Sequence, residues 1–118
     1  MSNILNMDII NGVMQIDEDD ATFYFSMVQV VFDEAEEMFT GIEDGVNNAD
    51  YTGLRNVTHK FKGRASTLGL EALAEQLGIM ENLSRDKGDM AEIINIAEKI
   101  PELLEQTRLE LENLKKGV

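Results

Sequence analysis

The apolar side chains of this chain recur at three- and four-residue intervals, and a single proline interrupts its 118 residues. In an α-helix this spacing places apolar side chains on one face, where they pack against a core. The nine glycines fall mostly between the periodic segments, and runs of β-branched residues are few. Because glycine and proline mark turns rather than helix interiors, the sequence predicts an all-α fold.

Five helices can be placed from this pattern and from their capping residues. Asp17–Asp20 supply negative charge and an N-cap to a long second helix, Asp50 caps the third, and Gly69 ends it. Gly45–Ala49 is expected to be a loop, and Pro101 is expected to kink the last helix or split it in two. The expected helices span about residues 7–14, 20 to 43 or beyond, 50–68, 70–85 and 90–116.

Short connections between helices favour antiparallel neighbours. We therefore expect an up-down-up-down antiparallel four-helix bundle, with the short N-terminal helix packed across one end. A length of 118 residues suits one domain with one core, so residues 1–118 are expected to form a single domain. The start at Met1 and the lack of a linker after the last helix favour a complete protein, and a closed core favours a monomer.

Composition argues against several classes of function. Ten Lys and Arg residues against 23 Asp and Glu give a net charge of −13, so neither nucleic acid nor an anionic membrane is an expected partner. With no cysteine and one histidine, the chain is not expected to hold a disulfide, a metal or a cofactor. Because no secretion signal or long apolar run is present, the expected compartment is the cytoplasm, and also the nucleus if the source is eukaryotic.

The single histidine lies on the water-facing side of the third expected helix. The apolar stripe of this helix comprises Leu54, Val57, Phe61, Ala65 and Leu68. At about 100° per residue, His59 projects roughly 160° from the centre of that stripe. Lys62 and Gly63 follow at three and four residues, so a cation and a residue without a side chain lie one turn above the imidazole. This combination is suited to a phosphoryl group.

Glu81 is expected to orient the histidine. The third and fourth helices form an antiparallel hairpin that turns near Gly69 and Leu70, so residues equidistant from the turn face each other, and position 59 faces position 81. Glu81 lies close to the apolar seam of its own helix, where a carboxylate needs a hydrogen-bond donor. A hydrogen bond from Nδ1 of His59 would fix the tautomer and leave Nε2 as the nucleophile.

These features resemble the histidine-containing phosphotransfer (HPt) domains of multistep phosphorelays. The pattern of that family is His-x-x-Lys-Gly, then a small residue and a Leu-Gly turn, and His59, Lys62, Gly63 and Thr67–Leu70 match it. The resemblance covers nearly the whole chain. Segments 7–23 and 81–85 look most similar to the fungal osmosensing phosphorelay intermediates. Arg64 departs from the pattern, because a small residue is usual at its position.

The resemblance implies a role for each site residue. His59 Nε2 would accept a phosphoryl group from a receiver-domain aspartate and pass it to another receiver, Lys62 would steady the phosphoryl oxygens, and Gly63 would let the partner's backbone approach. Glu81 would hold the imidazole ring. The implied partners are response-regulator receiver domains and a hybrid histidine kinase. The chain itself would be a phosphotransfer intermediate rather than an enzyme, with Mg²⁺ held by the receiver.

A receiver also needs a docking surface. Ile9, Val13 and Ile16 recur at helical spacing on the short first helix, and the apolar surplus continues at the start of the long helix. We expect part of this set to be exposed and to contact the receiver, against the alternative that the short helix only caps the core. Arg64 either adds a phosphate-facing cation or obstructs docking. The expected docking residues are Ile9, Val13, Ile16, Phe23, Met27, Val28 and Arg64.

Two alternative functions stay open at this point. The chain is also compatible with an HPt module that a chemotaxis-type kinase domain phosphorylates. The second alternative, from a different class, is a helical adaptor that has kept the bundle without the transfer chemistry. Whether His59 accepts a phosphoryl group separates the adaptor from both phosphotransfer functions.

Overall fold

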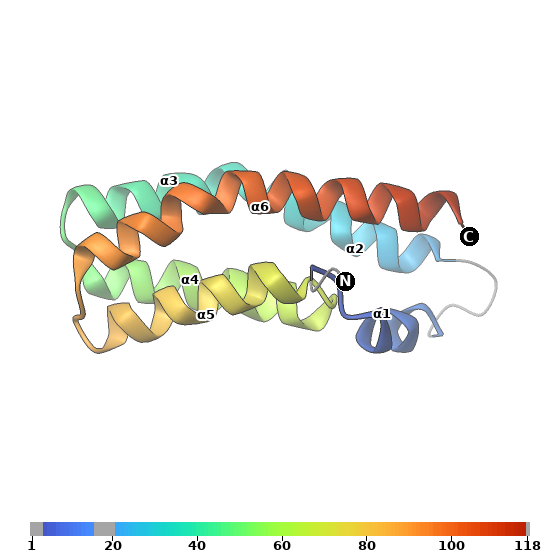
Figure 1. The fold of residues 1–118 in the computed structure, drawn as a ribbon, viewed down its shortest axis with the longest axis horizontal. Coiled ribbons are helices and arrows are strands. Elements are labelled where there is room, and N and C mark those ends of the chain that lie inside the picture. The colour runs from blue at the N-terminus through green and yellow to red at the C-terminus, as the bar shows by residue number, and fades with distance from the viewer. Residues whose placement is uncertain (1–3, 16–20, 118) are drawn as a thin grey trace.

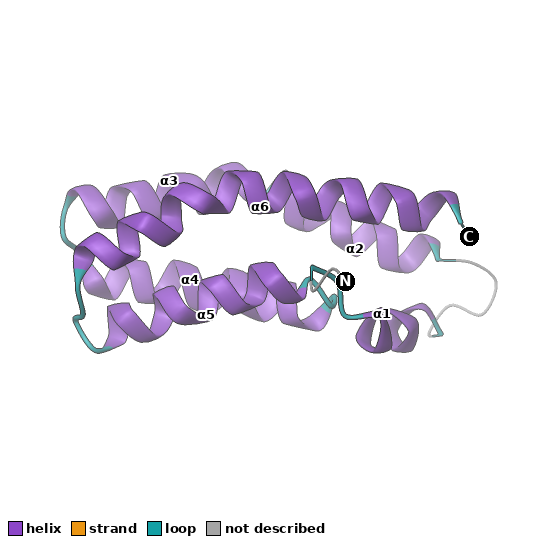
Figure 2. Cartoon of the chain, in the orientation of Figure 1, coloured by secondary structure: helices purple, strands orange, loops and turns teal. Residues whose placement is uncertain are grey.

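The computed structural model describes residues 4–15 and 21–117, and over these residues the chain forms helices and no strand (Figure 2). The predicted all-α class is therefore confirmed. None of the described helices is both long and apolar enough to cross a membrane. The helices are α1 (Met7–Met14), α2 (Thr22–Asp33), α3 (Ala35–Asn47), α4 (Tyr51–Thr67), α5 (Glu71–Arg85) and α6 (Met90–Lys116).

Four long rods make up the bundle (Figure 1). The helices α2 and α3 follow one another to form the first rod, and α4, α5 and α6 form the others, each running opposite to the rod before it. Helix α3 also packs against α6, which closes the ring around the buried apolar residues. This arrangement agrees with the expected up-down-up-down bundle.

The first helix lies at the end of the bundle where α4 turns into α5 (Figure 1). Asn6 caps α1, because its side-chain oxygen accepts a hydrogen bond from the Ile9 N–H. The Asn6 N–H donates to the Gly69 carbonyl over 2.8 Å, and Ile10 of α1 is fully buried. The N-terminal segment is thus joined to the α4–α5 turn, as the expected packing across one end requires.

Tyr24 of α2 joins the first rod to the same turn. Its hydroxyl donates a 2.7 Å hydrogen bond to the Leu68 carbonyl, and its side chain has no exposed surface. Burial raises the pKa of the Tyr24 hydroxyl, because the charged phenolate would lose its hydration. One end of the bundle is therefore held by polar contacts that originate from α1, α2 and the α4–α5 turn.

The expected long second helix, which was to run to about Glu43 or beyond, is two helices, α2 and α3, the second of which ends at Asn47. The break falls at Glu34, whose φ of −91° and ψ of 0° lie outside helical values. The expected loop at Gly45–Ala49 is also displaced, because α3 continues to Asn47. Leu54 packs closely on Gly45 within this helix, because a Cβ at position 45 would lie only 2.5 Å from Leu54 Cγ.

Pro101 lies inside α6, which continues from Met90 to Lys116, so the expected split of the last helix does not occur. The axis of α6 changes direction along its length (Figure 1), consistent with the loss of one intrahelical hydrogen bond at proline. Asp50 caps α4 as expected, since its carboxylate accepts from the Gly53 N–H. The expected capping run Asp17–Asp20 lies outside the described residues.

We predict that Gly69→Ala lowers the free energy of unfolding by about 1–3 kcal/mol. Gly69 has a φ of +73°, and a Cβ there would lie 2.8 Å from both the Asn6 carbonyl oxygen and Ile10 Cγ1. Gly12 is the matched control, because nothing lies within 4 Å of a Cβ at that position of α1. Gly12→Ala should leave stability unchanged or raise it by up to about 1 kcal/mol. Urea unfolding of both variants measures these free energies. Equal stabilities of Gly69→Ala and Gly12→Ala would contradict the requirement for glycine at position 69.

Candidate functional site

His59 lies in the middle of α4 with its side chain 71% exposed, as the helical pattern predicted. Its Nδ1 lies 2.7 Å from Oε2 of Glu81 on the neighbouring helix α5. The predicted hydrogen bond between positions 59 and 81 is therefore confirmed. The contact orients the imidazole with one nitrogen against the protein and leaves the other, Nε2, on the side away from Glu81.

Glu81 is almost fully buried, with 8% of its surface exposed, and both of its oxygens are engaged. Oε2 faces His59, and Oε1 lies 2.6 Å from Nζ of Lys62. The hydrogen bond from Lys62 lowers the pKa of the Glu81 carboxyl, burial opposes this shift, and the hydrogen bond from His59 adds to it. An ionised carboxylate only accepts hydrogen bonds, so Nδ1 of His59 is the donor in this contact, and the neutral imidazole in this arrangement has its lone pair on Nε2.

Two further cations of α4 bind glutamates across the bundle. Lys60 Nζ lies 3.1 Å from Oε1 of Glu37 on α3, and the Arg64 guanidinium is paired with Glu34 at the break between α2 and α3. Both cations also flank the Phe61 ring, at 5.3 Å for Lys60 Nζ and 5.5 Å for Arg64 Cζ from its centroid. The two pairs lie one helical turn apart and link α4 to the first rod.

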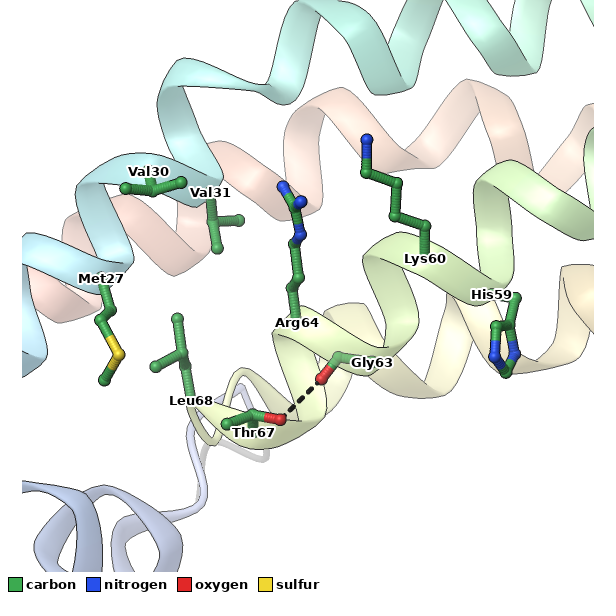
Figure 3. A pocket seen from close by; sticks show the side chains of 9 residues that line it. All are labelled: Met27, Val30, Val31, His59, Lys60, Gly63, Arg64, Thr67 and Leu68. Atoms are coloured by element: carbon green, nitrogen blue, oxygen red, sulfur yellow. Dashed lines mark hydrogen bonds between the residues drawn. The ribbon is translucent and has the colours of Figure 1, made fainter.

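A groove of about 620 Å³ runs between α2 and α4 beside the histidine. Figure 3 shows that Lys60 and Arg64 point toward the first rod, whereas the His59 ring points away from it. The wall from α2 is apolar, and the wall from α4 carries the charged groups. The lining residues are Met27, Val30, Val31, His59, Lys60, Gly63, Arg64, Thr67 and Leu68.

Gly63 is exposed, and nothing lies within 4 Å of where a Cβ would stand. The packing of this chain therefore does not require glycine at this position. The space above Gly63 opens directly onto the groove and lies one turn from His59 (Figure 3). A glycine at this position leaves that space clear.

The expected docking residues differ in how exposed they are and in where they lie. Ile9 and Phe23 are exposed, and Met27 is half-buried and lines the groove together with Arg64. Val13 is half-buried and packs against the core, and Ile16 lies outside the described residues. Val28 is only 5% exposed and belongs to the core, so its expected docking role is wrong. It faces inward because it follows the buried Tyr24 by one turn.

A comparison with known protein families matches residues 26–116 to the Hpt domain. The chain belongs to the Hpt domain family. The match spans the bundle from α2 to α6, which includes the four residues His59, Lys62, Gly63 and Glu81. Over the described residues, no group of three or more His, Cys, Asp or Glu side chains is placed to hold a metal ion.

Two curated relatives of this Hpt domain are both named phosphorelay intermediate protein YPD1. The Saccharomyces cerevisiae protein is 32% identical over 87 residues, which cover 71% of this chain and 51% of the relative. The Candida albicans protein is 27% identical over 81 residues, which cover 69% and 44%. The chain thus spans about half the length of the curated relatives it matches.

Two solved structures share the fold. Histidine-containing phosphotransfer protein B from Pseudomonas aeruginosa matches with a TM-score of 0.81 and 19% identity, over 100% of this chain and 99% of that one. Saccharomyces cerevisiae Ypd1, in a co-crystal structure with the receiver domain of its downstream response regulator Ssk1, matches with a TM-score of 0.66 and 24% identity. This match covers 95% of the present chain and 90% of Ypd1. Both show that the Hpt fold extends over the N-terminal helix as well.

Several residues of the site escaped the sequence analysis. Glu34 and Glu37, the partners of Arg64 and Lys60, were not singled out, nor were Val30 and Val31 of the groove. One signal did exist, because the segment from residue 23 to 42 carries more apolar residues than one helix face can bury. Val30, at 48% exposure, belongs to that surplus.

We predict that Glu81→Gln lowers the free energy of unfolding at pH 7 by about 1–3 kcal/mol. Because the pKa of Glu81 is lower in the folded protein than its ordinary value of 4.5, the carboxylate stabilises the fold above pH 4.5. This contribution is lost as the pH falls from 4.5 through the folded pKa. The stability difference between wild type and Glu81→Gln should therefore shrink as the protein is acidified.

Urea unfolding from pH 7 to pH 3 measures this difference. Glu105→Gln is the matched control, since Glu105 binds Arg108 on the exposed side of α6 and its pKa is also lowered. Its effect should be clearly smaller at every pH because solvent screens the pair. A Glu81→Gln difference that does not change with pH would contradict the assigned ionisation.

Proposed function

We propose that this Hpt protein is a phosphorelay intermediate that carries a phosphoryl group on Nε2 of His59. The Nε2 lone pair attacks the phosphorus of a receiver-domain aspartyl phosphate, the N–P bond forms, and the bond from phosphorus to the aspartate oxygen breaks. The aspartate leaves as a carboxylate. A second receiver then takes the phosphoryl group by the reverse exchange. The receiver supplies Mg²⁺ and the in-line geometry, so the chain acts as carrier rather than enzyme.

The observation that carries the proposal is the 2.7 Å contact between His59 Nδ1 and Glu81. When phosphorus bonds to Nε2 while Nδ1 keeps its proton, the imidazole ring becomes positively charged. A buried, ionised carboxylate at Nδ1 balances that charge and holds the ring in place. The 71% exposure of the ring meanwhile gives a partner's active site access to Nε2.

The Lys62 ammonium has different acceptors before and after phosphorylation of His59. In the free protein its ammonium pairs with Glu81, and its side chain is 36% exposed. A phosphoryl group on Nε2 of His59 offers more negative charge one turn from Lys62 on α4. Lys62 then moves to the phosphoryl oxygens, while His59 keeps its hydrogen bond to Glu81. Gly63, one residue on, leaves room for the backbone of the receiver.

The proposed partners are receiver domains, the donor being that of a hybrid histidine kinase and the acceptor that of a response regulator. The yeast relative named YPD1 and the Ypd1–Ssk1 receiver complex support this choice. The exposed residues Ile9 and Phe23 provide the docking surface together with the groove beside His59, which Met27 lines. We further propose that residues 1–118 act as one monomeric domain in the cytoplasm, and in the nucleus as well if the cell is eukaryotic.

The test is label transfer from a phosphorylated receiver domain, for which the Ssk1 receiver is a suitable first probe. We predict that wild type gains acid-labile, alkali-stable label and that His59→Gln gains none, because the chain has one histidine. Lys60→Gln is the matched control, since it changes an exposed neighbour on α4 that does not touch Glu81. It should keep the label.

Absence of label on folded wild type, from several receivers, would contradict the proposed relay. Label that persists on His59→Gln would place the acceptor elsewhere. Circular dichroism confirms in each case that the helices are intact.

A further inference from the structure

Arg64 is half-exposed in the groove, and its position there has a consequence for partner choice. Its guanidinium is held over Phe61 and against Glu34, and it points toward the first rod rather than toward His59 (Figure 3). The sequence left two roles for Arg64, a phosphate-facing cation or an obstruction to docking. In this conformation the guanidinium does not face His59, so it is not a phosphate-facing cation. The guanidinium instead forms part of the groove wall, facing the apolar wall of Met27, Val30 and Val31.

The guanidinium has more donors than this chain satisfies. Arg carries five N–H donors in a fixed fork, and among the described residues Glu34 is the carboxylate that pairs with it; even a bidentate pair with one carboxylate occupies only two of the five donors. The side chain is 36% exposed, so water in the groove is available to the other donors. A partner that covers the groove expels that water, and donors left without an acceptor weaken binding.

We propose that Arg64 is a specificity-determining residue that makes the groove selective for one kind of receiver surface. The favoured surface inserts an apolar side chain between Met27, Val30 and Val31 and places an oxygen acceptor, carboxylate or carbonyl, against the guanidinium. A receiver that presents only apolar groups, or a lysine or arginine, at that point is rejected. This inference rests on the proposed function, since it concerns which receivers exchange phosphoryl groups with His59.

Lys60 provides a matched comparison within the same groove. It lies one turn before Arg64 on α4, lines the groove, stacks near the same ring and pairs with Glu37 as Arg64 pairs with Glu34. Its side chain is more exposed, at 43%, and its ammonium sits on a flexible stem that can turn into solvent. Covering the groove therefore leaves Lys60 hydrated, and it should not distinguish among receivers.

The experiment follows single-turnover phosphoryl transfer from a set of phosphorylated receiver domains to wild type, Arg64→Met and Lys60→Met. Here kcat is the maximal rate constant of transfer, and KM is the protein concentration that gives half of it. Methionine keeps an unbranched helix-forming side chain and removes every donor. For Arg64→Met we expect KM to rise by about tenfold or more with the receivers that wild type prefers, and to fall by about fivefold or more with those that it rejects, because no unpaired donor is then covered. Saturating kcat should stay within about twofold of wild type, since Arg64 does not face the phosphoryl group.

Lys60→Met should shift KM by the same factor for all receivers, so the ranking stays that of wild type. If Arg64→Met also preserves the ranking of the receivers, or lowers kcat for all of them, Arg64 does not determine selectivity. Either result leaves the proposed relay itself intact. If folded wild type accepts label from none of the receivers, the proposed function fails, and the inference fails with it. Thermal unfolding of both variants separates loss of folding from loss of selectivity.

Discussion

The buried carboxylate of Glu81 needs hydrogen-bond donors, and the arrangement of the site follows from how it obtains them. Removing a carboxylate from water is costly unless charged or polar partners replace its hydration. Here α4 supplies both partners, His59 and Lys62, from positions three residues apart on one face. The antiparallel packing of α4 on α5 brings position 81 opposite them. Displacement of either helix by one turn would leave the carboxylate buried without either donor.

The surrounding charges make this site less electropositive than its residue types suggest. Within the stretch 60–64 of α4, each cation is paired with a glutamate outside this helix: Lys60 with Glu37, Lys62 with Glu81 and Arg64 with Glu34. With a net charge of −13 for the whole chain, little long-range attraction for an anion is left. Selective recognition must therefore come from contacts at short range, where apolar fit in the groove and pairing of individual donors decide between partners.

A contact between two helices can be predicted from the sequence when a short connection fixes the register of those helices. The His59–Glu81 bond was predictable because a short turn at Gly69 fixes which residues of α4 and α5 face each other. The Glu34–Arg64 pair was not, because α2 and α4 are separated along the chain and their register is set by core packing and by the break at Glu34. The same limit hid the Tyr24 hydrogen bond to Leu68. Val28 was misplaced because a helix with apolar residues on most sides does not reveal which side is buried.

We propose that His59 carries the phosphoryl group on Nε2 while its Nδ1 donates a hydrogen bond to Glu81. Nitrogen NMR of the phosphorylated protein distinguishes the two ring nitrogens directly. Because the chain has one histidine, ¹⁵N labelling of histidine gives the two ring nitrogens of His59 alone. We expect coupling of phosphorus to Nε2 and a slowly exchanging proton on Nδ1 that is lost in Glu81→Ala, which removes the acceptor. Phosphorus on Nδ1, or a protected Nδ1 proton that survives Glu81→Ala, would contradict this assignment.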